Sequence, residues 1–290
     1  MKKFVLLLLF VSSCTYSQIK GIVLDESNKP IPFVNIWVEN ENIGTTSEEN
    51  GSFSIHVGDQ NKVLIFSALG FETKKVKFSE AEKVVLKETA FQLDEVIISK
   101  SKSTVEIEIG GSKNINHTYF PGGVPWIYAK RFNYSNDFSK TPFIKNTIIF
   151  TTSEIINATF KLRIFEVNKE GTPGLDLLDE DIIVTVKKGN QENKIDLTKY
   201  NLVFPQNGIF IAFEWMIIES NKIKLNYKEK NSNKKREYIT FAPSIVCNPV
   251  EIENTFEYRG GKWTQSKKSI REGKYKNKVT EPAINLTLTN

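Results

Sequence analysis

The feature that most constrains the fold is a succession of short segments in which apolar and polar side chains alternate, each bounded by glycine, proline or asparagine. In "FVNIWVEN" (33–40), Val34, Ile36 and Val38 fall on one face of an extended chain and the intervening residues on the other. Such short segments, separated by turn-forming residues, are typical of antiparallel β-structure and lack the period of an amphipathic helix. The pattern predicts an all-β fold.

The segments before residue 100 are short and closely spaced. They occupy residues 19–25, 33–40, 49–57, 62–72, 73–79 and 82–88. This spacing predicts a β-sandwich over residues 18–99. Its closing strand is expected at Phe91, Leu93, Val96 and Ile98. Residues 100–117 are charged, rich in serine and contain one candidate strand, "TVEIEI", so we expect a linker there.

The segments after residue 117 are longer. They occupy residues 144–153, 157–168, 180–188, 208–220, 222–229, 236–243, 254–266 and 283–289. Their number and length predict a larger, jelly-roll-like β-sandwich over residues 118–290. Gly260-Gly261 marks a hairpin turn. Residues 126–135, "WIYAKRFNYS", are the one expected short helix or bridge.

Glu214 is the most unusual residue of the second region. In "IFIAFEWMII" (209–218), the face that includes Trp215 is continuously apolar and is expected to point into the core. Glu214 falls on the other face, where a lone carboxylate is costly unless it is paired. Pairing with a cation such as Arg163 is one interpretation, and a ligand-binding or general-acid role is the other. Glycosidase chemistry would also need a second acid, from residues 176–181.

A predicted turn is crowded with carboxylates, namely those of Asp176, Asp179 and Asp181. Calcium takes six to eight oxygen ligands, often from such loops. A Ca²⁺ site is therefore one interpretation, and a set of solvated turn carboxylates is the other.

Aromatic side chains supply further binding candidates. Trp126 and Trp263 lie beside predicted loops, and Tyr258 belongs to the same hairpin as Trp263. Exposed aromatic rings offer an apolar face and a polar edge on which sugar rings can stack. These three residues and Glu214 are the predicted binding residues.

Motifs that carry enzyme chemistry are missing from the sequence. There is no nucleophile elbow, phosphate loop or dinucleotide fingerprint. The two histidines, His56 and His117, do not form a His-x-x-Glu pattern, which zinc peptidases need. Cys247 is expected to be a small buried side chain rather than a reactive thiol. We expect no enzymatic activity and no cofactor, with Ca²⁺ as the one alternative.

The chain is mildly basic, with a net charge of +5, and its lysines concentrate in residues 221–238 and 267–278. Glutamates interleave with these lysines, and export to the cell envelope would separate the protein from nucleic acid, so we expect no nucleic-acid partner. A solvated surface is one interpretation of the lysines. Contact with an acidic polysaccharide or a lipid-A surface is the other.

The N-terminus has the features of an export signal. Lys2 and Lys3 precede an apolar stretch too short to span a bilayer. Cleavage before Gln18 would remove residues 1–17. Alternatively, "VSSC" ending at Cys14 is a lipobox, and Cys14 would carry a lipid anchor. Both routes predict an exported protein in the periplasm, at the outer membrane or outside the cell, and no later stretch predicts a transmembrane helix.

Six motifs in the first region resemble a known family. They are Gly21-x-Val23-x-Asp25, Pro30-Ile31-Pro32, Val34-x-Ile36, Gly44-Thr45-Thr46-Ser47, Gly51-x-Phe53-x-Ile55 and Phe66-Ser67-Ala68-Leu69-Gly70-Phe71. In this order they resemble the carboxypeptidase-regulatory-like domain of Bacteroidetes proteins. The resemblance implies a seven-stranded, transthyretin-like β-sandwich. Each matching position has a structural reason, so the resemblance implies a scaffold and no chemistry.

Two further stretches resemble exported proteins. "LDEVII" (93–98) resembles the end of the N-terminal extension in TonB-dependent receptors, where a plug and a barrel of many strands would follow. The 190 residues after Lys100 are expected to hold neither plug nor barrel. Residues 162–186 and 195–215 resemble a strand block of Bacteroidetes surface proteins, which implies a carbohydrate-binding or adhesin sandwich.

These patterns together predict a non-enzymatic, exported binding or structural module whose partner is a glycan or an envelope protein. Two alternatives stay open. One is a glycan-active hydrolase that uses Glu214. The other is an accessory component of an outer-membrane complex that pairs its exposed edge strands with a partner.

Overall fold

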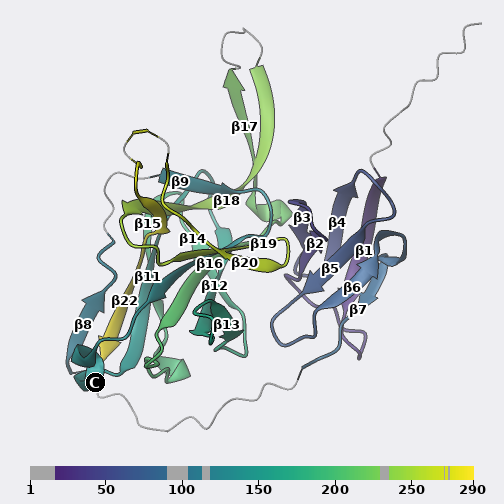
Figure 1. Cartoon of the computed structure of the whole chain (residues 1–290). Helices are drawn as coiled ribbons and strands as arrows, with labels where there is room; N and C mark the ends of the chain where they lie inside the picture. Colours follow the sequence, from purple (N-terminus) through teal and green to yellow (C-terminus); the bar gives the residue numbers. More distant parts are fainter. Residues whose placement is uncertain (1–16, 90–103, 113–117, 229–234, 271, 274) are drawn as a thin grey trace, which may run out of the picture.

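The computed structural model describes residues 17–89, 104–112, 118–228, 235–270, 272–273 and 275–290 (Figure 1). Its strands confirm the predicted all-β fold. The helical elements among the described residues are short 3₁₀ turns, at Phe78–Glu80, Asn136–Lys140, Thr198–Tyr200 and Glu219–Asn221. Residues 1–16 of the predicted signal segment, which include Cys14, lie outside the described residues, as do the predicted closing strand at 91–98 and His117.

Residues 17–89 form the N-terminal sandwich. Its strands are β1 (Ser17–Leu24), β2 (Asn35–Val38), β3 (Gly44–Thr46), β4 (Ser52–Val57), β5 (Val63–Ser67), β6 (Lys74–Lys77) and β7 (Lys83–Val85). One sheet has the order β4-β1-β7 and the other β3-β2-β5-β6. Buried side chains of both sheets, such as Ile36, Phe53 and Phe66, meet in one core. The period-two alternation of the sequence thus points its apolar residues between the sheets.

The described residues from 104 onward form the C-terminal sandwich. One of its sheets has the order β13-β12-β16-β10-β19-β20, with β14 also pairing with β12. These strands are β10 (Ile127–Phe132), β12 (Ala158–Val167), β13 (Pro173–Asp176), β14 (Ile182–Val186), β16 (Ile209–Trp215), β19 (Thr255–Arg259) and β20 (Lys262–Gln265).

The second sheet has the order β17-β18-β11-β22-β8, and β9, β15 and β21 pair with its inner strands. These strands are β8 (Glu106–Ile109), β9 (Thr118–Gly122), β11 (Phe143–Ser153), β15 (Gly189–Asp196), β17 (Lys222–Lys228), β18 (Lys235–Val250), β21 (Val279–Pro282) and β22 (Ile284–Thr289). Strand β8 comes from the segment expected as a linker and pairs with β22.

The core of the C-terminal sandwich lies between its two sheets. Ile209, Ile211, Phe213, Trp215 and Ile217 all contribute to it, as the apolar face of this segment predicts. Phe160 stacks on Phe213, with ring centroids 4.3 Å apart. Cys247 is also buried here, and burial raises the pKa of its thiol well above the ordinary value, consistent with the predicted inert role.

The expectation of a short helix or bridge at residues 126–135 is wrong. Residues 127–132 form β10, which lies between β16 and β19. Tyr128, Lys130 and Phe132 alternate along this strand and point into the interior, where Lys130 forms an ion pair with Glu281 at 2.8 Å. A buried lysine broke the apolar pattern that would otherwise have indicated a strand.

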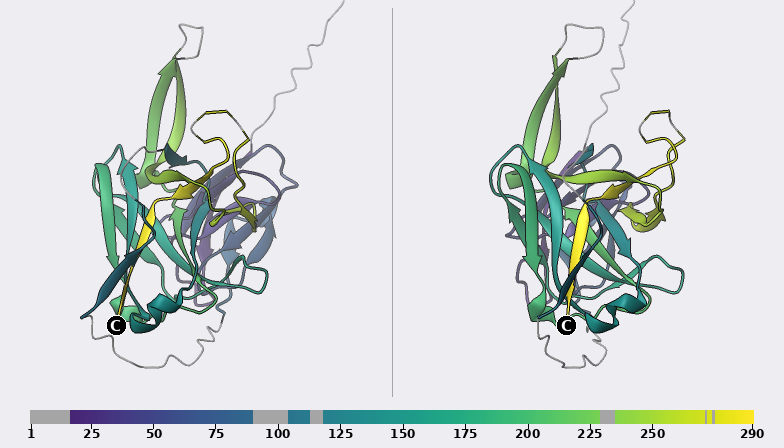
Figure 2. Two further views of the ribbon diagram at one scale, coloured as in Figure 1. Left: turned by 60° about the vertical axis from the view of Figure 1, so that its left-hand side comes forward. Right: turned by 90° about the vertical axis from the view of Figure 1, so that its left-hand side faces the viewer.

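The molecule has two distinct ends (Figures 1 and 2). The β17–β18 hairpin and the loop between β20 and β21 project at one end, and the C-terminus lies at the other. The N-terminal sandwich packs beside the C-terminal one, and β1 begins on the side from which the hairpin projects. No helix among the described residues has the length and apolar character to cross a bilayer.

Candidate binding site between the two sandwiches

Strand β2 is buried on both faces because its second face docks on the C-terminal sandwich. Ile36 and Val38 point into the N-terminal core, whereas Trp37 packs with Ile65, Val124 and Trp126. Gly44 on β3 allows the close approach, since a Cβ there would lie 2.8 Å from Cδ of Pro125. We call this contact region the seam.

Charged side chains on the outer face of the β12–β16 pair complete the seam. Glu214 on β16 is fully buried, and its Oε1 accepts a hydrogen bond from Nδ2 of Asn35 at 2.7 Å. Its Oε2 forms an ion pair with Nη1 of Arg163 at 2.5 Å, and Nε of Arg163 reaches Oδ2 of Asp176 at 2.6 Å. The predicted pairing of Glu214 with Arg163 is therefore present, and the N-terminal sandwich supplies a third partner.

A second cation extends this network. Lys161 has only 1% of its side chain exposed, and its Nζ lies 2.6 Å from Oδ2 of Asp181. The same ammonium donates a hydrogen bond of 2.9 Å to the backbone carbonyl of Phe33. Phe33 has a φ of 54°, which is unusual for a bulky residue and is held by the surrounding contacts. This rare conformation precedes β2, where the N-terminal sandwich meets the ion network.

The ion network fixes the protonation of Glu214. Burial alone would raise the pKa of Glu214, but the positive charges of Arg163 and Lys161 outweigh it and hold this pKa below its ordinary value. For Asp176 burial has the larger effect, and its pKa is raised despite Arg163. Because Glu214 is ionised, fully buried and bonded at both oxygens, it is poorly placed to donate a proton to a substrate.

The three aspartates of the predicted calcium site have separate surroundings. Asp176 binds Arg163 and Asp181 binds Lys161, whereas Asp179 is exposed. Within the described residues, no group of three or more His, Cys, Asp or Glu side chains is arranged to hold a metal ion. The calcium site stays a prediction that these contacts do not favour.

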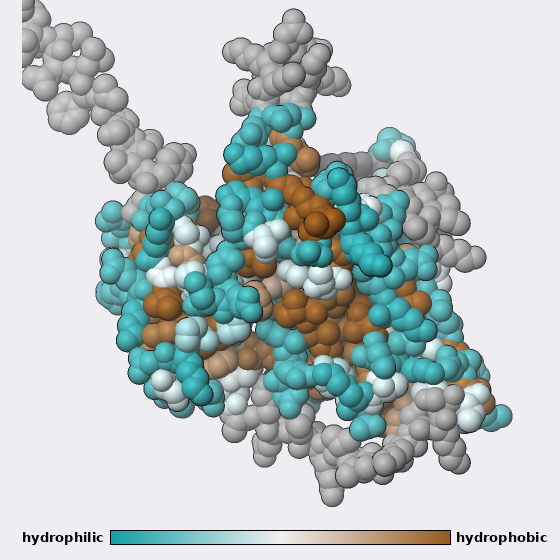
Figure 3. All heavy atoms as spheres, turned by 180° about the vertical axis from the view of Figure 1, so that it is seen from behind, coloured by the Kyte–Doolittle hydropathy of each residue, from teal (hydrophilic) through white to brown (hydrophobic). Residues whose placement is uncertain are grey.

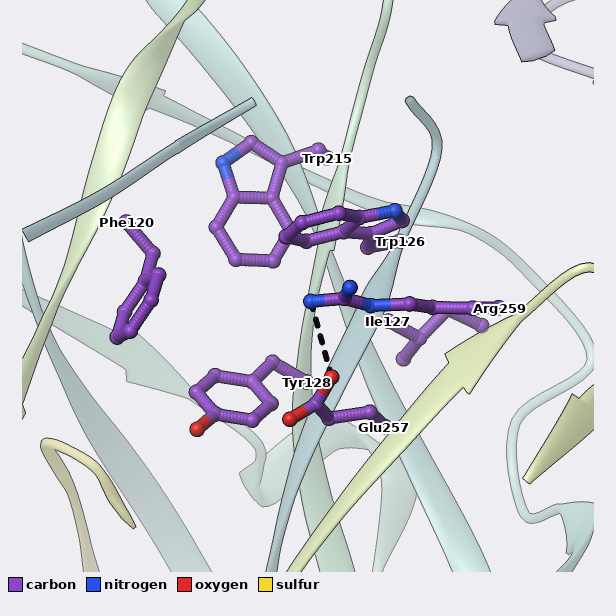
Figure 4. Close-up of a pocket in the computed structure, with 7 residues that line it drawn as sticks. All are labelled: Phe120, Trp126, Ile127, Tyr128, Trp215, Glu257 and Arg259. Carbon is purple, nitrogen blue, oxygen red and sulfur yellow. Dashed lines mark ion pairs between the residues drawn. The ribbon is translucent and has the colours of Figure 1, made fainter. Parts of the chain in front are cut away.

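An aromatic pocket opens next to the seam, at the edge of the C-terminal sandwich (Figure 4). It is lined by Phe120, Trp126, Ile127, Tyr128, Trp215, Glu257 and Arg259. Strands β10, β16 and β19 contribute from one sheet, and β9 contributes from the other. The enclosed space is about 20 Å³, enough for about one water molecule. So little space remains because a side chain of the protein lies against the aromatic rings.

The side chain that lies against the aromatic rings is that of Arg259. The guanidinium Cζ lies over the ring of Trp126, 3.2 Å from the ring centroid (Figure 4). Nη2 of Arg259 forms an ion pair with Oε2 of Glu257 at 2.9 Å. Its Nε is buried and has no hydrogen-bond partner. The Trp126 indole in turn donates from Nε1 to Oδ1 of Asn42 at 3.3 Å. Arg259 and Trp126 thus connect the pocket to the N-terminal sandwich.

A polar cleft lies on the other side of Arg259. Two turns face each other across it, one from each sandwich, and its volume is about 550 Å³. Its lining residues are Asn40, Glu41, Asn42, Arg259, Gly260 and Lys262. Gly260 and Gly261 have positive φ angles of 56° and 89°, as the predicted two-residue hairpin turn requires. We call this space the seam cleft.

The structure separates the predicted binding residues. Trp126 lines the aromatic pocket, but Tyr258 and Trp263 lie on the opposite face of the hairpin, where they pack with Phe165 and other apolar residues. Glu214 is buried in the ion network. Sequence reasoning did not find Arg259 or Asn42. The alternation in "EYRGGKW" already places Glu257 and Arg259 on one face and Tyr258 on the other.

Comparison with known proteins identifies the first region. Residues 19–98 match the model of the CarboxypepD_reg-like domain family, which confirms the resemblance. Over 106 residues the chain is 31% identical to TonB-dependent receptor P3 of Formosa agariphila, a match that covers 34% of this chain and 11% of the receptor. It is 28% identical over 93 residues to TonB-dependent receptor SusC of Bacteroides thetaiotaomicron, covering 31% and 9%. The chain spans about a tenth of the length of these relatives.

A solved structure adds little. A DUF3823 family protein from Bacteroides ovatus aligns with 80% of this chain and 97% of its own, at 10% identity and a TM-score of 0.21. A TM-score this low does not establish a common fold. The comparisons therefore show a CarboxypepD_reg-like domain over residues 19–98, in a region that is similar to part of TonB-dependent receptors.

Proposed function

We propose that the protein is an exported, non-enzymatic module of the cell envelope that binds an acidic glycan in the seam cleft. The observation that carries this proposal is the pairing of two polar turns, one from each sandwich, across an open cleft beside Trp126. Amide, carboxylate and cationic side chains on facing turns are the groups that hydrogen-bond sugar hydroxyls and carboxylates.

The charge of the cleft favours an acidic ligand. Glu41 is already paired with Lys62 at 2.6 Å, and Arg259 with Glu257. Lys262, by contrast, forms no ion pair with a carboxylate in the part of the chain that the structure describes. The cleft therefore has an uncompensated positive charge, which would attract a uronate or sulfate group.

Arg259 lines the seam cleft and also covers the ring of Trp126, so its position decides whether a ligand in the cleft can reach that ring. Its ion pair with Glu257 is partly exposed, with 41% and 27% of the two side chains accessible, so exchanging this carboxylate for one of a ligand costs little. A guanidinium that moves toward a ligand in the cleft would uncover the face of Trp126. A sugar ring could then stack on that face.

The contacts across the seam would hold the two turns at a fixed separation. Each turn belongs to a different sandwich, so their separation depends on the contacts of Trp37, Asn35 and Glu214 across the seam. A preformed cleft loses less conformational entropy on binding than two independent turns would. This gives the buried ion network a role in binding that requires no contact with the ligand.

Binding of the mature chain to alginate, a polyuronate, tests the proposal, with neutral dextran as the comparison. We expect alginate to bind and Lys262→Gln to weaken that binding by about fivefold, the effect of one lost charge-assisted contact. Lys187→Gln is the matched control, since Lys187 is exposed and does not line the cleft. Equal losses in both variants, or equal binding of dextran, would show that the cleft does not recognise acidic glycans.

A further inference from the structure

The end of the molecule with the β17–β18 hairpin also carries the loop of residues 266–278, which joins β20 to β21 (Figures 1 and 2). We propose that this end rests on a membrane surface with anionic lipid headgroups, and that the loop makes the principal contact. The proposal concerns a surface distinct from the seam cleft and does not depend on glycan binding.

The loop is strongly basic. Residues 267–278 contain six lysine or arginine residues and one acidic residue, Glu272. Lys267 pairs with Glu253 at 3.2 Å and Lys276 with Glu272 at 2.6 Å, but both pairs are solvent-exposed and therefore weak. Lys268 and Lys278 form no ion pair with any described carboxylate. These ammonium groups are available to lipid phosphates.

Ile270 distinguishes this loop from an ordinary charged surface. Its side chain is 92% exposed, the highest value among the exposed large apolar residues that the structure describes. It lies two residues from Lys268, so an aliphatic group and cations occupy the same short stretch. A membrane interface takes up both, because headgroups attract the cations while the acyl boundary accepts the apolar side chain.

The loop has internal structure that presents Ile270. The backbone N–H of Ser269 donates to the carbonyl of Lys278 at 2.9 Å, and that of Asn277 donates to Ser269 at 2.8 Å. The base of the loop continues into β21, which pairs with β18. The two arms of the loop are therefore fastened together next to Ile270, and the loop is tied to the strand that also forms the hairpin.

The hairpin offers a second contact at the same end. Tyr238 and Ile239 on β18 are 42% and 50% exposed. Lys224 on β17 pairs with Glu237 at 3.3 Å, with both side chains largely exposed. Figure 3 shows apolar side chains among polar ones on the stem of the hairpin. Hairpin and loop together provide two separated points of contact, which would orient the molecule on a surface.

The start of the described chain is compatible with this orientation. Strand β1 begins on the side from which the hairpin projects (Figure 1). Cys14, the predicted lipidation site, precedes Ser17 by three residues, and an extended chain of that length spans at most about 11 Å. A lipid on Cys14 would hold the same end of the molecule against the membrane.

Ile270 also separates a lipid partner from a polysaccharide. A soluble acidic polysaccharide could bind the lysines but has no apolar phase for an isoleucine side chain. A lipid surface would use both, so its affinity would depend on Ile270 as well as on Lys268. This difference decides between the two partners in one experiment.

The test is cosedimentation of residues 18–290 with vesicles of phosphatidylcholine, with and without phosphatidylglycerol. We expect binding to the anionic vesicles only, weakened about fivefold by Lys268→Gln and measurably by Ile270→Ser. Two control variants should bind as the parent chain does. Lys140→Gln changes an exposed lysine outside the loop and the hairpin, and Leu175→Ser removes an apolar side chain that is 75% exposed.

Three results would overturn the proposal. They are no binding to anionic vesicles, equal binding to neutral ones, and equal losses in the control variants. Competition with alginate tests whether the loop binds a soluble acidic polysaccharide instead of a membrane. If alginate binds through Lys268 and Ile270→Ser changes neither alginate nor vesicle binding, the loop recognises anionic polymers and not a membrane. Thermal unfolding of each variant confirms that the fold is retained, as expected for exposed positions.

Discussion

Glu214 gains its role from its surroundings rather than from its own chemistry. It is fully buried, and Arg163 and Asn35 hold both of its oxygens. Removing one partner of a buried ion pair leaves the other charge uncompensated, which costs about 3–5 kcal/mol. The residue that the sequence marked as unusual is therefore a structural contact between the sandwiches.

Replacing Glu214 by glutamine should change the pH dependence of stability. The pKa of Glu214 is below its ordinary value of 4.5 in the folded protein, so its ionised form stabilises the fold above that pH. This contribution is lost as the pH falls through the lowered pKa. In urea unfolding, the parent chain should exceed Glu214→Gln in stability at pH 7 and lose that advantage below pH 4.5. A difference that is constant with pH would contradict this role.

Lys130 and Glu281 form a second buried pair, inside the C-terminal sandwich. Lys130 also donates to the carbonyls of Gly110 and Ile284, so it would stay in place when Glu281 is replaced. We expect Glu281→Gln to lower the free energy of unfolding by about 3 kcal/mol. Glu272→Gln, which breaks the exposed pair with Lys276, should change it by less than about 0.5 kcal/mol. Equal effects in denaturant titrations would refute the difference.

At the scale of elements, the alternation of apolar residues predicts the strands that have one buried face. The alternation did not predict β15 or β10. In β15, five residues are exposed and the other three, Gln191, Asn193 and Ile195, are only half-buried, so "GNQENKID" has no apolar face to recognise. In β10, Lys130 stands at a core position, where its tertiary partners, Glu281 and the carbonyls of Gly110 and Ile284, satisfy its ammonium group. Both failures concern contacts that lie far away in the sequence.

Glycine at position 44 of β3 tests how closely the sandwiches pack. A Cβ there would lie 2.8 Å from Cδ of Pro125 and 2.9 Å from the carbonyl oxygen of Ile36. We expect Gly44→Ala to destabilise the protein by about 1–3 kcal/mol through overpacking. Gly58→Ala is the control, because a Cβ at Gly58 meets nothing within 4 Å. Thermal unfolding would contradict the close approach if both variants behaved alike.

At the scale of the whole molecule, the two sandwiches meet through an apolar cluster and an ion network, and the seam cleft lies beside them. The first sandwich could be predicted from motifs within one region of the sequence. The seam could not, because Asn35 and Glu214 are 179 residues apart and neither has a local signal for the other. For the same reason, Trp126 could be proposed as a binding residue, but its neighbours Asn42 and Arg259 could not.

Intrinsic fluorescence during an alginate titration tests the central claim that ligands bind beside Trp126 at the seam. The chain has four tryptophans, and Trp126→Phe and Trp263→Phe each remove one partly exposed indole. We predict a saturable fluorescence change that Trp263→Phe retains and Trp126→Phe loses, together with weaker binding in Trp126→Phe. The opposite pattern, or a change that both variants retain, would contradict a binding site between the two sandwiches.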